Sequence, residues 1–491
     1  MALQFGTSGV RGLVTEMTDL ECYLYTEAFV RYVKTRVSPD RVALAGDYRS
    51  STPRIKKAVA FALRKSGLTV DDCGAVPTPA LAFHGVRNRV PSIMVTGSHV
   101  PDDRNGIKFY MPWGEVLKSD EAEISSVYRE AKGRLAHGSD NALSYFTREG
   151  ELQADFQTAA DAENPEARQA YIGRYLSFFP PGCLKGSRIV LWQHSSAARE
   201  VLLELMEALG ARVEAVGWSE RFIPVDTEAV ENTDQLSAWV RQAGASALIS
   251  ADGDGDRPLL VDERGKVVRG DVLGILVADF LGADSVSAPV SCNTALERSG
   301  RFEHVARTRI GSPYVIESMQ QALQAGWRKV VGYEANGGFL TASEFDAPSA
   351  NGRLAALPTR DAALPVLAAL ARSAAGGRPV SAWVSDLPSR YTQSGLLRDF
   401  PSEKGREIVS LFRERDHRAA DELFGRAFGP VRQLDFTDGV RLTFAGGDIV
   451  HLRPSGNAPE FRCYTEASTE ERAAGMNRIA LEIVRERFLP S

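Results

Sequence analysis

Short apolar runs and amphipathic stretches alternate along the chain, and this alternation limits the possible folds more than any other feature of the sequence. Apolar runs such as 41–46 and 188–192 predict buried strands, whereas amphipathic stretches such as 197–209 and 313–325 predict helices. Strands that alternate with helices form βαβ units in mainly parallel sheets. Because the pattern starts three times with a similar length, the sequence favours three α/β units related by an internal structural repeat.

The pattern changes after an Ala-, Gly- and Arg-rich stretch at 371–378, which is typical of a linker. Strands at 440–444, 449–452 and 461–466 and a closing helix at 469–487 predict a smaller α+β domain. The length of 491 residues agrees with about three to four domains. We therefore expect three α/β domains with mainly parallel mixed sheets and one C-terminal α+β domain, at residues 1–150, 151–262, 263–376 and 377–491.

The composition, 44% hydrophobic and 25% charged, is typical of a soluble globular protein. A net charge of −5 argues against a nucleic-acid partner or a polybasic membrane role. The five cysteines are scattered without a CxxC pair, which indicates reduced thiols. No apolar stretch is long enough to cross a bilayer, and the start of the chain has neither a basic nor an apolar signal region. We therefore expect a cytoplasmic protein.

Residues 251–258 read Ala-Asp-Gly-Asp-Gly-Asp-Arg-Pro and follow an apolar run. Carboxylates at alternate positions repel one another unless a cation lies among them, and the glycines let the backbone curl so that the oxygens converge. Hard oxygen ligands select Mg²⁺ or Ca²⁺. Asp252, Asp254 and Asp256 are therefore candidate metal ligands. The alternatives are an acidic surface turn and an EF-hand loop, but Arg257 stands where an EF-hand needs glycine.

A second motif, Val-Thr-Gly-Ser-His-Val-Pro at 95–101, ends an apolar strand in a tight turn that would expose the oxygen of Ser98. It differs from the nucleophile elbow of hydrolases because Val100 stands where that motif has glycine. Taken alone, His99 is typical of a polar loop residue and Lys108 of a solvated cation.

Three further glycine-containing segments carry polar side chains suited to sugars and phosphates. Residues 332–338 offer Glu334 and Asn336 to sugar hydroxyls, although Asn-Gly is also an ordinary β-turn. Residues 453–459 combine an arginine with polar side chains and a freed backbone, which suits a phosphate, or form a surface loop. Residues 5–12 suit an oxyanion but lack the ending of a Walker A loop.

Taken in this order, the five segments resemble those of the α-D-phosphohexomutase family, and the match covers essentially the whole chain. The resemblance implies four domains around a central cleft, with Ser98 as a phosphoserine and Mg²⁺ held by Ser98, Asp252, Asp254 and Asp256. Asp47 and Arg49 match a family segment whose role is partly structural. The further catalytic groups implied are Arg11, His99, Lys108 and Arg257, and the implied substrate contacts are Thr7, Ser8, Arg309, Gly311, Glu334, Asn336, Arg453, Ser455, Gly456 and Asn457.

The resemblance implies an enzyme that interconverts hexose 6-phosphates and hexose 1-phosphates through a phosphoserine and a bisphosphorylated sugar. Within the family, the sequence looks most like bacterial phosphomannomutases that feed GDP-mannose synthesis. The alternatives are a phosphoglucomutase or dual-specificity mutase, a metal-dependent sugar phosphatase, and a non-catalytic sugar-phosphate- or calcium-binding protein. Val100, Asn336 and Asn457 depart from the residues usual in the family. We expect hexose phosphates as partners, no nucleic acid or membrane, and a monomer or homodimer.

Overall fold

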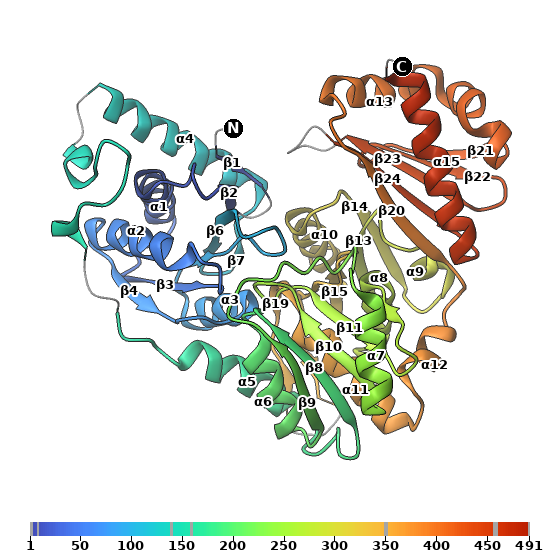
Figure 1. Cartoon of the computed structure of the whole chain (residues 1–491), viewed down its shortest axis with the longest axis horizontal. Helices are drawn as coiled ribbons and strands as arrows, with labels where there is room; N and C mark the ends of the chain where they lie inside the picture. Colours follow the sequence, from blue (N-terminus) through green and yellow to red (C-terminus); the bar gives the residue numbers. More distant parts are fainter. Residues whose placement is uncertain are drawn as a thin grey trace.

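The computed structural model of the chain describes residues 3–6, 9–137, 141–157, 161–347, 352–454 and 460–489. Four large sheets dominate this part of the chain, and we refer to the parts that build them as domains I to IV (Figure 1). The predicted fold class, three related α/β domains followed by a smaller α+β domain, is confirmed. No helix in the described ranges is long and apolar enough to cross a membrane.

Domains I, II and III repeat one strand order. In domain I the order is β4-β3-β5-β6, in domain II β9-β8-β10-β11 and in domain III β14-β13-β15-β16. In each case the first three strands are parallel and the fourth is antiparallel to the third. The expected internal repeat is therefore present in the structure, although the strands that close each sheet differ.

The elements of domain I are β1 (Gln4–Phe5), β2 (Gly9–Leu13), α1 (Asp19–Lys34), β3 (Arg41–Gly46), α2 (Thr52–Lys65), β4 (Thr69–Asp72), α3 (Thr78–Asn88), β5 (Ser92–Val95), β6 (Arg104–Met111), β7 (Gly114–Glu115) and α4 (Lys118–Ala136). Short 3₁₀ turns at Asn141–Tyr145 and Ala154–Phe156 lead to domain II. That domain contains α5 (Glu166–Phe178), β8 (Arg188–His194), α6 (Arg199–Ala208), β9 (Arg212–Trp218), α7 (Thr233–Ala243), β10 (Ala247–Ala251), β11 (Pro258–Asp262) and β12 (Val267–Val268).

Domain III contains α8 (Gly270–Phe280), β13 (Ser285–Pro289), α9 (Ala295–Arg298), β14 (His304–Thr308), α10 (Ser312–Gln324), β15 (Val330–Tyr333), β16 (Phe339–Thr341), β17 (Phe345–Asp346), β18 (Arg353–Leu354), β19 (Leu357–Asp361), α11 (Ala363–Gly376) and α12 (Val380–Ser385). Domain IV contains β20 (Tyr391–Leu397), α13 (Ser402–Ala420), a π-helical turn (Asp421–Gly425), α14 (Arg426–Phe428), β21 (Val431–Asp435), β22 (Val440–Phe444), β23 (Ile449–Pro454), β24 (Phe461–Ala467) and α15 (Glu470–Phe488).

The predicted domain limits at 150, 262 and 376 stay predictions. Two short elements lie just beyond them: β12, at 267–268, pairs with β11 of domain II, and α12, at 380–385, packs on α8 and α11 of domain III.

The buried apolar clusters group the four domains into two parts, whereas each domain has its own sheet. One buried apolar cluster runs through domains I, II and III, from Ala43 on β3 to Leu387 after α12. Domain IV has a cluster of its own, from Leu397 to Val484, between its antiparallel sheet and helices α13 and α15. Figure 1 shows domain IV lying beside α9, α10 and β14 of domain III. Domain IV is therefore a separately packed unit attached to a three-domain body.

Candidate active site

Three of the predicted motifs occupy the same position in the repeated fold. The serine loop (96–103) joins β5 to β6, the acidic loop (252–257) joins β10 to β11, and the third loop (334–338) joins β15 to β16. In α/β sheets, sites form beyond the carboxyl ends of the parallel strands. Each domain therefore delivers one loop from the carboxyl end of its third strand.

The serine loop and the acidic loop meet directly. Ser98 Oγ donates a hydrogen bond to Asp252 Oδ2 at 2.6 Å, across 154 residues of sequence. Both side chains are fully buried. The predicted proximity of the serine oxygen to the acidic loop is therefore present in the structure.

Ser98 has an unusual backbone conformation, with a φ of 59° that non-glycine residues rarely adopt. Its N–H donates to Thr96 Oγ1 at 2.8 Å. The Arg49 guanidinium donates to three carbonyl oxygens of the same loop, those of Ser98, Val100 and Pro101, and to that of Arg104 at the start of β6, at 2.5–3.0 Å. The loop is thus held in its strained form by a buried cation.

Asp47 completes this support. Its carboxylate accepts from Arg49 Nε at 3.1 Å and from the hydroxyls of Thr52 and Thr96 at 2.7 and 2.6 Å. Asp47 and Arg49 are 4% and 1% exposed, so their charges pair with each other and with the backbone rather than with solvent. This geometry agrees with a structural role for the 47–49 segment.

The acidic loop offers converging oxygens. Asp252, Asp254 and Asp256 are fully buried, and one carboxylate oxygen of each lies within 4.8 Å of the others. Within the described part of the chain, Oδ1 of Asp254 and Oδ1 of Asp256 have no hydrogen-bond partner. Unpartnered carboxylate oxygens at this depth are costly without a cation. The donor set therefore fits a divalent metal ion.

The other oxygens of the acidic loop bind cations of the protein. Lys108 Nζ donates to Oδ2 of Asp254 at 2.6 Å and to Oδ2 of Asp256 at 2.7 Å. Burial lowers the pKa of Lys108, but the two carboxylates outweigh it, and the net shift is upward. Burial and the neighbouring carboxylates raise the pKa of Asp252. Burial also raises the pKa of Asp256, but Arg360 and Lys108 reverse this and lower it.

Two residues of the site carry no signal in the sequence. Arg360, on β19, donates from Nη2 to Asp256 Oδ2 at 2.8 Å and from Nη1 to Glu334 Oε2 at 3.0 Å, so it joins the acidic loop to the third loop. Thr78, at the start of α3, donates its N–H to the backbone oxygen of Asp254 at 2.8 Å and its hydroxyl to Asp254 Oδ2 at 2.5 Å. Neither lies in a glycine-containing motif, and only the tertiary structure identifies them.

The predicted charged groups His99, Arg257 and Arg11 surround this centre. His99 Nδ1 lies 3.5 Å from Ser98 Oγ, and burial together with Arg257 and Arg11 lowers the pKa of His99. Arg257 Nε lies 3.8 Å from Asp252 Oδ2 and 3.7 Å from Asp256 Oδ1. Burial and the repulsion from Arg257 lower the pKa of Arg11 to about 10.

The third loop brings Glu334 into the site, whereas the oxygen of Asn336 supports the loop itself. Asn336 Oδ1 accepts from Gly338 N at 2.9 Å, and Gly337 adopts a φ of 86°. The ordinary-turn interpretation and the site interpretation of this motif are therefore compatible.

The remaining predicted residues lie elsewhere. Arg309 stacks on Tyr314 with its Cζ 5.0 Å from the ring centre, and Gly311 precedes α10. Arg453, at the end of β23, pairs with Asp438 of the same domain at 3.0 Å. Among the described residues, neither Arg309 nor Arg453 makes a hydrogen bond or ion pair with the acidic loop. Thr7, Ser8, Ser455, Gly456 and Asn457 lie outside the described residues.

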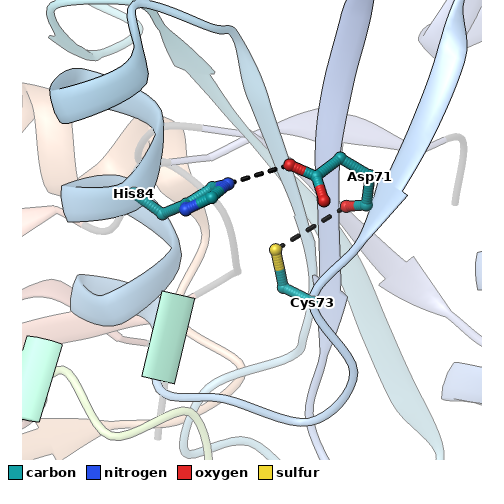
Figure 2. Close-up of side chains that lie close together, drawn as sticks. All are labelled: Asp71, Cys73 and His84. Atoms are coloured by element: carbon teal, nitrogen blue, oxygen red, sulfur yellow. Dashed lines mark hydrogen bonds and ion pairs between the residues drawn. The ribbon is translucent and has the colours of Figure 1, made fainter. Parts of the chain in front are cut away.

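Asp71, Cys73 and His84 form a second cluster of potential metal ligands, shown in Figure 2. His84 Nε2 lies 2.8 Å from Asp71 Oδ2, and the Cys73 thiol donates to the Asp71 backbone oxygen at 3.6 Å. Asn88 and Asn164 fill the remaining positions on the imidazole and the carboxylate, at 3.1 and 2.8 Å. Since these donors and acceptors already satisfy one another, the cluster ties β4 to α3 and to the segment before α5.

Comparisons with known proteins agree with the geometry. Family profiles described as phosphoglucomutase/phosphomannomutase alpha/beta/alpha domains I, II and III match residues 2–134, 179–265 and 269–391, and the C-terminal domain of the same family matches 408–484. A phosphomannomutase of Sinorhizobium fredii is 42% identical over 96% of this chain and 97% of its own length. A phosphomannomutase of Salmonella muenchen is 41% identical over 99% and 96%, and a phosphoglucosamine mutase of Kineococcus radiotolerans is 30% identical over 99% and 100%.

A solved structure of a phosphoglucomutase/phosphomannomutase family protein from Burkholderia thailandensis has the same fold. It superimposes with a TM-score of 0.73 at 19% identity, covering 98% of this chain and 96% of the other.

Proposed function

This chain belongs to the phosphoglucomutase/phosphomannomutase family of α-D-phosphohexomutases, and we propose that its substrates are mannose 6-phosphate and mannose 1-phosphate. The contact between Ser98 Oγ and the buried acidic loop carries the proposal for the transfer chemistry. The substrate is favoured by the phosphomannomutase relatives at 41–42% identity, against 30% for the phosphoglucosamine mutase.

Ser98 is the proposed carrier of the phosphoryl group. In the first half-reaction the bond between phosphorus and Ser98 Oγ breaks and a bond to a sugar hydroxyl oxygen forms. The hydroxyl proton passes to a base, and Ser98 Oγ takes up a proton as it leaves. His99 is the candidate base because its lowered pKa keeps it neutral, whereas Asp254 and Asp256 hold Lys108 as a cation. The bisphosphorylated sugar then turns over and returns its other phosphoryl group to Ser98. Phosphoryl transfer depends mainly on positioning and charge neutralisation. The fixed turn of Ser98 and the buried cations Lys108 and Arg257 are suited to both tasks.

The proposed metal is Mg²⁺, held by Asp252, Asp254, Asp256 and an oxygen of phospho-Ser98. When bound, it would neutralise charge on the phosphoryl oxygens. Lys108 balances the acidic loop from the other side through the oxygens that it already binds.

The other predicted residues have substrate-binding roles in this proposal. Glu334 and Asn336 contact the sugar, and Arg453 with the 455–457 segment binds the phosphate that is not transferred. Arg309, Gly311 and the 7–8 segment complete the substrate contacts. We further propose that the enzyme acts in the cytoplasm, as a monomer or homodimer, and supplies GDP-mannose synthesis.

The test compares kcat/KM for mannose 1-phosphate, glucose 1-phosphate and glucosamine 1-phosphate in coupled assays, with free phosphate measured in parallel. We expect mannose 1-phosphate to be preferred and little phosphate to be released. Preference for mannose over glucose is expected to be modest, because a site discriminates weakly against a small change in one hydroxyl that it does not contact. A higher kcat/KM for glucosamine 1-phosphate, or release of phosphate at the rate of sugar turnover, would reject the proposal.

Intact-mass analysis tests the carrier. A fraction of the purified enzyme should carry one phosphoryl group on Ser98, and Ser98→Ala should carry none and lose turnover. Phosphorylation retained in that variant would assign the carrier to another residue.

A further inference from the structure

The turn between β21 and β22 places a carboxylate where domain IV meets domain III. Asp438 is 9% exposed, and its Oδ2 accepts a hydrogen bond from the backbone N–H of Ile310 at 3.0 Å. The same oxygen forms an ion pair with Nε of Arg453 at 3.0 Å, without the geometry of a hydrogen bond. A single oxygen thus joins a guanidinium of domain IV to the 308–311 segment of domain III.

The position of Asp438 is set by the sheet of domain IV. His451 Nε2 donates to the Asp438 backbone oxygen at 2.5 Å. His451 is 1% exposed and burial lowers its pKa to about 4, so the imidazole is neutral and has one N–H to donate. His451 and Arg453 are two residues apart on β23 and therefore point to the same face. The turn also packs closely on β23, since a Cβ on Gly439 would lie 2.3 Å from the Leu452 carbonyl oxygen.

We propose that Asp438 is a positioning residue, whose carboxylate orients the Arg453 guanidinium toward the non-reacting phosphate of a hexose phosphate and seats it against domain III. The inference rests on the proposed function, because it takes Arg453 as a ligand of that phosphate. Asp438 approaches the Nε side of the guanidinium, which leaves the two Nη atoms to bind the phosphate as a fork. Arg453 thereby binds the substrate from a fixed orientation rather than from a freely rotating side chain.

A carboxylate beside Arg453 could strengthen or weaken phosphate binding, and the two effects change KM in opposite directions. A carboxylate beside Arg453 repels phosphate, so a residue that only competed with the substrate would weaken binding in the wild-type enzyme. A positioning residue strengthens binding. Removal of the carboxylate therefore raises KM if Asp438 positions Arg453, as proposed here, and lowers KM if Asp438 only competes with the phosphate.

The first experiment measures kcat and KM of Asp438→Ala with mannose 1-phosphate. We expect KM to rise about fivefold, as for loss of an ion pair, with kcat within about twofold of the wild type. The matched control is Asp435→Ala, because Asp435 ends β21 just before the same turn and its carboxylate accepts only from Thr437 among the contacts described. A KM unchanged or lowered in Asp438→Ala, or raised equally in Asp435→Ala, overturns the proposal.

A double variant tests whether Asp438 acts through Arg453. Residues that act through one another have non-additive effects. The KM of Asp438→Ala/Arg453→Ala should equal that of Arg453→Ala within about twofold, whereas multiplied effects would overturn the positioning role.

Hydrogen exchange provides a readout that does not depend on turnover. The Ile310 amide is bonded to Asp438, so a peptide covering 308–311 should exchange faster in Asp438→Ala and at the wild-type rate in Asp438→Asn, which keeps the acceptor. Unchanged exchange in Asp438→Ala overturns the link to domain III, and Asp438→Asn also serves for the kinetics if Asp438→Ala does not fold. Failure of the proposed function looks different: the wild-type enzyme itself would not convert mannose 1-phosphate.

Discussion

Ser98 combines burial, a left-handed backbone conformation and a hydrogen bond to Asp252, and all three depend on residues outside its own loop. Strained conformations persist at functional sites only where the surroundings enforce them. Here the conformation is enforced by Arg49, whose guanidinium donates to three carbonyl oxygens of the loop and to that of Arg104, while its Nε donates to Asp47. The orientation of the proposed phosphoryl carrier is therefore fixed by a side chain 49 residues away in sequence.

We predict that Arg49→Lys lowers kcat and destabilises the protein by about 3 kcal/mol, because one ammonium group cannot replace the planar fork and Asp47 loses part of its compensation. The measurements are turnover with mannose 1-phosphate and urea denaturation. Arg36→Lys is the matched control, since Arg36 forms an exposed pair with Glu123 and should change stability by no more than about 0.5 kcal/mol. Wild-type kcat in Arg49→Lys would contradict the enforcing role.

Among the individual residues of the candidate site, the sequence predicted those that lie in motifs and missed those that do not. Ser98 and the three aspartates are recognisable because glycines and neighbouring polar groups mark their loops. Arg360 lies near the end of a strand and Thr78 at the start of a helix, and they join the site only because β19 ends and α3 begins beside the acidic loop. Contacts of this kind depend on tertiary packing, which a local pattern does not record.

The strands around the site likewise include some that the sequence predicted and one that it missed. The apolar strand predicted to end in the 95–101 motif and the apolar run before the aspartates correspond to β5 and β10, which end at the serine loop and the acidic loop. The antiparallel partner of the first, β6, was not predicted, because Asn105 and Lys108 interrupt its apolar pattern while both are buried in the structure. These buried polar residues of β6 belong to the site, and they interrupt the hydrophobic pattern from which a strand is predicted.

Strand β23 carries a titratable group that links stability to pH. His451 has a pKa lowered to about 4 by burial, against an ordinary value of 6.5. Above pH 6.5 the group is neutral in both the folded and unfolded states. Between pH 6.5 and 4 the unfolded state binds the proton and the folded state does not, so stability falls as the pH falls.

We predict that lowering the pH from 7 to 5 costs the wild-type protein about 2 kcal/mol of stability through His451. His451→Gln keeps an N–H donor for Asp438 and does not titrate, so its loss over the same range should be smaller by that amount. Urea midpoints followed by circular dichroism at the two pH values measure the difference. Equal losses in the two proteins would show that His451 is not buried in its neutral form.

On the scale of the whole molecule, the acidic loop is where three domains meet. Asp254 of domain II binds Thr78 and Lys108 of domain I, and Asp256 binds Lys108 and Arg360, the latter from domain III. A cation bound to Oδ1 of Asp254 and Oδ1 of Asp256 would therefore stabilise the three-domain body as a unit rather than a single loop.

We predict that Mg²⁺ at about 100 times its dissociation constant stabilises the folded protein by about 2.7 kcal/mol and raises its melting temperature by roughly 3 °C. Removal of the metal with a chelator should reverse the shift. In Asp254→Asn, melting should respond little to either treatment. A wild-type melting temperature that is indifferent to Mg²⁺ would contradict a metal site in this loop.

The equivalent placement of the three loops has a consequence for sugar preference. In the proposed function the equivalent turns have separate tasks, because the group-carrying hydroxyl, the acidic ligands and the sugar contacts lie on three different domains. Under that proposal, remodelling of the 334–338 turn changes the preferred sugar while the transfer chemistry stays intact. Arg360 limits this freedom, because it bridges two of the turns, and any replacement turn must still present an acceptor to it.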